Sequence, residues 1–149
     1  MKRNSRKKAR ANVVRLRTWT HAQAQSAQLY VASVVRSVRE HFLEAIRGHN
    51  RLEELSKREG RPDRNAIIAR DDAQREFDAA KARFDDAENE LNRLDVYILD
   101  PLQGLALIPF LQDERLAWFI FDLFDNEPLR FWRFQEDPLD TRRPVSTVA

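Results

Sequence analysis

The feature that most constrains the fold of this sequence is a strict alternation of four- and three-residue spacings within residues 66–94. Such a heptad repeat places its apolar members along one line of a helix, where a second helix packs against them. Small and large side chains alternate along this line, and Arg70 is its one polar member. The sequence predicts a helix over about residues 64–94 with a heptad seam of Ala66, Ala73, Phe77, Ala80, Phe84, Ala87, Leu91 and Leu94.

Residues 20–59 have the broader apolar periodicity of a second amphipathic helix. This stretch opens on Thr20-His21-Ala22-Gln23, which has the form of a capping box. Its buried stripe is expected to contain Val31, Val35, Val38, Phe42, Ala45, His49 and Leu52, widened on one flank by Leu29, Val34, Leu43 and Ile46. Gly60 and Pro62 end the pattern. Because the break is short, the two helices are predicted to form an antiparallel hairpin.

After residue 94 the period changes, and three short apolar segments predict an antiparallel β-meander. The expected strands span about residues 105–112, 115–124 and 129–135, and residues 136–149 are expected to be irregular. Pro109 has no amide hydrogen to give a ladder, so the first strand is predicted at the sheet edge. The predicted fold class is α+β: one domain over residues 18–149, with a long antiparallel helical hairpin followed by a three-stranded antiparallel β-meander packed on it.

Pairing these strands about their turns gives the sheet two faces of different character. One face is apolar throughout and is expected to cover the hairpin; it carries Ala106, Ile108, Phe110, Ala117, Phe119, Phe121, Leu123, Trp132 and Phe134. The other face includes Asp122 and Arg133, yet it is too apolar for free solvent. Either the C-terminal tail or a partner is expected to cover it. The candidate interface residues on this second face are Leu116, Trp118, Ile120 and Phe131.

Charge is distributed unevenly between the start of the chain and the rest. Residues 1–17 carry eight basic side chains and no acidic one, so the net charge of +2 leaves −6 for residues 18–149. So basic a segment, with few apolar side chains, is predicted to be a disordered arm. It serves either as a solubilising tail or as a non-specific ligand of nucleic-acid phosphates. The candidate phosphate-binding residues are Lys2, Arg3, Arg6, Lys7, Lys8 and Arg10.

Composition excludes several kinds of site. The chain has no cysteine, which rules out disulfides, thiolate zinc sites and cysteine nucleophiles, and its three glycines form no phosphate-binding loop. His41 and His49 are expected roughly 12 Å apart along one helix, too far to share a metal ion. No metal, cofactor or small-molecule ligand is indicated, and no apolar run reaches the roughly 18 residues of a membrane span. The absence of a secretory signal and of cysteine predicts a cytoplasmic location.

Several short motifs along the chain match the pattern of a known family. They are Trp19-Thr20 with Gln23-Ala24, Gly104-Leu105 with Pro109, Phe131-Trp132-Arg133, and Arg142-Arg143-Pro144. In this order they resemble the domain of unknown function 2203 family of prokaryotic proteins. The family has a histidine where this chain has Arg133. The resemblance implies a fold rather than an activity.

Three functional hypotheses follow from these features. The first is a non-catalytic interaction protein that forms a homodimer through its hairpin and sheet, because the flank of the first helix and the second sheet face both need cover. The second is a nucleic-acid or ribosome-associated accessory protein that uses the basic arm. The third is an enzyme that holds an anionic substrate with Arg133, Arg142 and Arg143. The sequence contains no recognisable catalytic motif, so we favour the first hypothesis.

Overall fold

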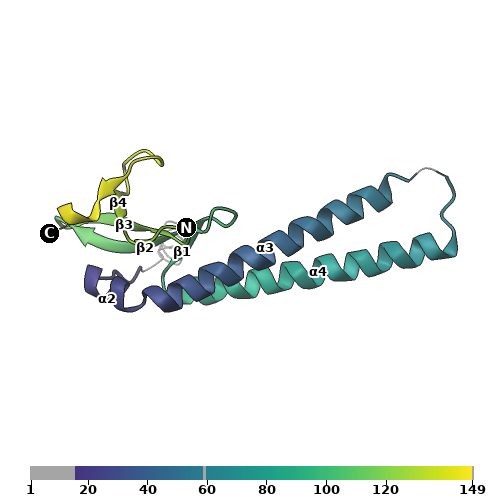
Figure 1. The fold of residues 1–149 in the computed structure, drawn as a ribbon, viewed down its shortest axis with the longest axis horizontal. Coiled ribbons are helices and arrows are strands. Elements are labelled where there is room, and N and C mark those ends of the chain that lie inside the picture. Colours follow the sequence, from purple (N-terminus) through teal and green to yellow (C-terminus); the bar gives the residue numbers. More distant parts are fainter. Residues whose placement is uncertain (1–15, 59, 149) are drawn as a thin grey trace, which may run out of the picture.

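The chain folds into a helical hairpin followed by an antiparallel sheet, in a computed structural model that describes residues 16–58 and 60–148 (Figure 1). The α+β class and the order of its two parts are as predicted. The helices are α2 (His21–Ser26), α3 (Gln28–Ser56) and α4 (Arg64–Arg93). The strands are β1 (Tyr97–Asp100), β2 (Leu105–Gln112), β3 (Arg115–Asp122), β4 (Phe131–Phe134) and β5 (Arg143–Pro144), and a 3₁₀ turn spans Val145–Thr147.

The capping box at the start of the first helix is confirmed. The Thr20 hydroxyl accepts a hydrogen bond from the amide of Gln23 at 3.1 Å, and the Gln23 side chain accepts one from the amide of Thr20 at 2.9 Å. The prediction of one continuous helix over residues 20–59 is wrong, however. Ala27, with φ −90° and ψ 1°, separates α2 from α3, and α3 ends at Ser56. The break turns α2 against the sheet, where Ala24 is completely buried.

The heptad seam between α3 and α4 is confirmed. The alanines at positions 73, 80 and 87 are buried, while the large Phe77 and Phe84 are half-buried rather than fully buried. The Phe84 ring lies 5.7 Å from the Phe42 ring, measured between centroids. Gly48 allows the helices to approach, since a Cβ at that position would lie 3.1 Å from the Cα of Phe77.

The sheet has five strands in the order β1-β2-β3-β4-β5, not the three that were predicted. The first predicted strand matches β2 in both bounds, whereas β3 ends at residue 122 and β4 spans only residues 131–134. Neither β1 nor β5 was expected. β5 has two residues and pairs with β4 inside the tail that was predicted to be irregular.

The prediction that β2 is an edge strand is also wrong, because β1 pairs with its first half. The β1 ladder begins with Tyr97 opposite Leu107, so it stops before it would need an amide from Pro109. Beside Pro109 the partner is instead the backbone of Trp19, whose N–H donates to the Pro109 carbonyl at 2.8 Å. The following turn places Asp113 and Glu114 at φ 53° and 62°, the left-handed geometry that suits a two-residue hairpin.

The core lies where the sheet covers the open end of the hairpin, at which α3 begins and α4 ends (Figure 1). The predicted first face of the sheet forms it: all nine side chains are buried except Leu123, which is half-buried. They pack against Val31, Val34, Val35 and Val38 of α3 and against Ala87 and Leu91 of α4. The rest of the hairpin projects beyond the sheet as a pair of helices (Figure 1).

Candidate functional site

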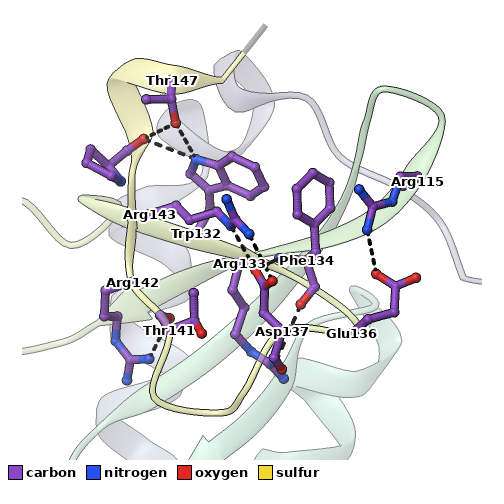
Figure 2. A network of polar contacts seen from close by, with 11 residues as sticks. Arg115, Trp132, Arg133, Phe134, Glu136, Asp137, Thr141, Arg142, Arg143 and Thr147 are labelled. Atoms are coloured by element: carbon purple, nitrogen blue, oxygen red, sulfur yellow. Dashed lines mark hydrogen bonds and ion pairs between the residues drawn. The ribbon is translucent and has the colours of Figure 1, made fainter.

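The three arginines proposed as an anion site do not gather around one open site, since Arg133 and Arg143 both donate to Asp137 and Arg142 lies apart from them (Figure 2). Arg143 pairs in register with Trp132, so the two share a face of the sheet. Arg133 is the next residue along β4 and therefore points to the opposite face. Arg142 is exposed and donates to the backbone carbonyls of Leu139 and Thr141, each at 3.0 Å. This separation leaves no common pocket for one anionic substrate.

The charge of Arg143 is already matched within the chain. Its Nε and Nη2 donate to the Asp137 carboxylate at 2.8 and 2.9 Å, and the amide of Phe134 donates to the same carboxylate at 2.8 Å. Mainly through the Arg143 hydrogen bonds, the pKa of Asp137 is lowered to about 2. The Arg143 guanidinium also lies 4.9 Å from the centre of the Phe134 ring. The Asp137–Arg143 ion pair connects the loop after β4 to β5, so the charge of Arg143 has a structural role.

Arg133 holds the loop after β4 against the second face of the sheet. Its side chain is only 4% exposed, and its Nη1 donates to the carbonyl of Asp137 at 2.8 Å. On the same face, the indole N–H of Trp118 donates to the side-chain oxygen of Gln135 in that loop. The C-terminal segment therefore covers part of this face, which is one of the two alternatives that the sequence left open.

Because the C-terminal segment covers this face, the four candidate interface residues have less exposed surface with which to contact a partner. Trp118 and Ile120 are 8% and 3% exposed, so they have little surface left to contribute. Leu116 and Phe131 are half-buried, and the neighbouring Leu111 is 58% exposed. The centre of the second face is thus filled within one chain, and only its margin presents apolar surface.

More apolar surface lies on the projecting hairpin. Ile46, Ile67 and Ile68 are 37%, 49% and 48% exposed. A hollow of about 620 Å³ lies at the end of the hairpin, where Arg58, Arg61 and Arg70 surround Leu55 and Ile67 among its lining residues. The sequence assigned these arginines no binding role, because Arg58 and Arg61 lie at the break between the helices and Arg70 is the polar member of the heptad seam. They could have been identified from the sequence by counting the charges of each helix separately.

The structure describes few of the remaining candidates. The candidate phosphate-binding residues lie outside the described residues; they are Lys2, Arg3, Arg6, Lys7, Lys8 and Arg10.

Within residues 16–58 and 60–148, no three His, Asp or Glu side chains lie close enough to hold one metal ion. In the same ranges, every helix is too short or too polar to cross a bilayer.

Comparisons of this chain with family models, with curated proteins and with solved structures gave no match. The resemblance to the domain of unknown function 2203 family therefore stays a prediction.

Proposed function

We propose that this protein is a non-catalytic interaction protein that self-associates through its helical hairpin. The observation that carries the proposal is the apolar surface of the hairpin beyond the sheet. In that stretch α3 and α4 pack against each other with no third described element beside them (Figure 1). Three isoleucines there are between 37% and 49% exposed.

The hairpin supports association better than the sheet face does. Complete burial of an isoleucine is worth roughly 1.5–3 kcal/mol, and a two-fold contact doubles the number of side chains buried. On the second sheet face, by contrast, Trp118 and Ile120 are already covered within one chain. The margin of that face can extend a dimer contact, but it offers one exposed large apolar side chain, Leu111, against three on the outer hairpin.

Sedimentation at micromolar concentration tests the proposal. We expect a species of about 35 kDa, twice the 17.6 kDa of one chain. Replacing Ile67 and Ile68 by Lys should weaken the dimer at least tenfold, because both side chains lose apolar contact surface. Leu139→Lys is the matched control, since Leu139 is 68% exposed but lies in the C-terminal loop. A 17.6 kDa species with no concentration dependence would refute self-association.

A further inference from the structure

Charge on the hairpin is polarised along α4 and the loop before it. Residues 57–70, here called the basic end, contain five basic and two acidic side chains. Residues 71–90, here called the acidic half, contain three basic and eight acidic ones. In α3, over residues 28–56, the two signs balance at four each. The polarity therefore belongs to one side of the hairpin.

Most of these charges are unused within the chain. The hairpin's own ion pairs join α3 to α4 through Arg51 with Glu76 and through Glu44 with Arg83. At the basic end, Arg58, Arg61, Arg64 and Arg70 are exposed and form no ion pair with another described residue. The same holds in the acidic half for the exposed residues Asp71, Asp72, Asp78, Asp85 and Asp86. Both ends are free to meet a charged partner.

A continuous open face connects the two ends. Positions 64, 68, 71, 75, 78, 82 and 85 of α4 recur at spacings of four and three, and all seven side chains are exposed. The heptad seam occupies the opposite side of the helix. The open face carries Ile68 and Ala82 among its charges, so it offers apolar contact as well. Because these positions lie along one face of α4, a second helix can lie along them.

We propose, resting on the self-association above, that two copies pack along this open face with their α4 helices antiparallel. Each basic end then lies beside the acidic half of the partner's α4. A parallel arrangement would instead set like charges side by side, which disfavours pairing. A two-fold axis across the middle of α4, near Arg75, generates both contacts from one surface.

Cysteine cross-linking tests the orientation directly, because the chain contains no cysteine of its own. Arg64 and Arg75 are both exposed on the open face, one at the start of α4 and one at the proposed axis. At 1.5 Å per residue, antiparallel packing separates the two copies of residue 64 by about 33 Å. Parallel packing brings them within about 10 Å. We expect Arg75→Cys to form a dimeric disulfide and Arg64→Cys to form none; efficient cross-linking of Arg64→Cys overturns the antiparallel arrangement.

Charge reversal tests the attraction. One variant carries Arg61→Glu and Arg64→Glu, and the other carries Asp78→Lys and Asp85→Lys. All four positions are exposed, and Asp63, which caps α4, is retained. Each variant alone should dimerise at least tenfold more weakly than the wild type, since its two ends now repel in the homodimer. Mixed together, the two variants should pair with restored affinity, because both contacts are again between opposite charges.

The possible results separate this inference from the proposed function. A monomeric wild type overturns both. A stable wild-type dimer whose affinity is unchanged by either reversal, or a mixture that does not regain affinity, overturns the antiparallel charge pairing and leaves self-association standing. Circular dichroism of each variant establishes that the helices are intact before its affinity is compared.

Discussion

Among single residues, Asp137 organises the C-terminal segment of the chain. Its carboxylate accepts hydrogen bonds from Arg143 in β5 and from the amide of Phe134 in β4, and its carbonyl accepts one from Arg133. The bonds from Arg143 and from the Phe134 amide favour the ionised carboxylate and lower its pKa from 3.8 to about 2. Because the folded-state pKa lies below the unfolded one, Asp137 stabilises the fold above about pH 4, and that stabilisation is lost as the pH falls towards 2.

We expect Asp137→Asn to lower the free energy of unfolding near neutral pH. The difference from the wild type should shrink between about pH 4 and pH 2, because the wild-type carboxyl is then protonated. Urea denaturation followed by tryptophan fluorescence at several pH values measures this. Asp140→Asn is the control, since Asp140 is exposed in the same loop. A difference from wild type that stays constant down to pH 2 would contradict the assignment of the effect to the carboxylate charge.

At the scale of elements, the two large seam residues of α4 have different surroundings. Phe84 packs against the buried core cluster and lies near Phe42 of α3. Phe77 lies farther out along the hairpin, against Gly48 and the ring of His49. Both are half-buried. We therefore expect the contribution of this heptad position to stability to depend on its distance from the sheet.

Phe84→Ala should cost about 3 kcal/mol of unfolding free energy, whereas Phe77→Ala should cost about 1–2 kcal/mol. The reason is that the cavity left by Phe84 borders the core, while that left by Phe77 opens towards solvent and can collapse. Chemical denaturation of the two variants beside the wild type provides the comparison. An equal loss for both, or a loss below about 1 kcal/mol for Phe84→Ala, would show that the seam does not couple to the core in this way.

At the scale of the whole molecule, the residues that form the core and the residues proposed for self-association lie in different parts of the hairpin. The core cluster draws its helical residues from the stretch of α3 up to Val38 and the stretch of α4 from Ala87 onwards. The outer part of the hairpin contributes no residue to this cluster: its buried Ala73 and Ala80 lie in the seam between the two helices, and Ile46, Ile67 and Ile68 are exposed. Shortening the hairpin should therefore spare the fold.

We expect a chain lacking residues 43–56 and 64–77 to fold as a monomer. Each deletion removes two whole heptads, so the seam keeps its phase and the original loop still joins the helices. Near-ultraviolet circular dichroism of the three tryptophans reports the core, and sedimentation reports the mass. Loss of cooperative unfolding would show that the outer hairpin is needed for the fold. A persistent dimer would place self-association elsewhere, most directly on the margin of the second sheet face.

Features that depend on local interactions could be predicted from the sequence. The heptad seam, the capping box at Thr20 and the strand over residues 105–112 could each be predicted, because spacing and side-chain type decide helix faces, caps and strand alternation. The division of the sheet into an apolar face over the hairpin and a mixed second face also followed from strand alternation.

Tertiary structure alone decided the features that depend on distant partners. The two residues of β5 form a strand only because β4 is beside them, and β1 forms only against β2. No local signal marks the break at Ala27, since alanine is a good helix former; the turn lets α2 dock on the sheet. Likewise, Arg133, Arg142 and Arg143 lie within eleven residues, but strand alternation puts Arg133 and Arg143 on opposite faces, and both donate to Asp137 rather than to a shared ligand. A strand or a site assembled from distant segments has no local period from which it can be predicted.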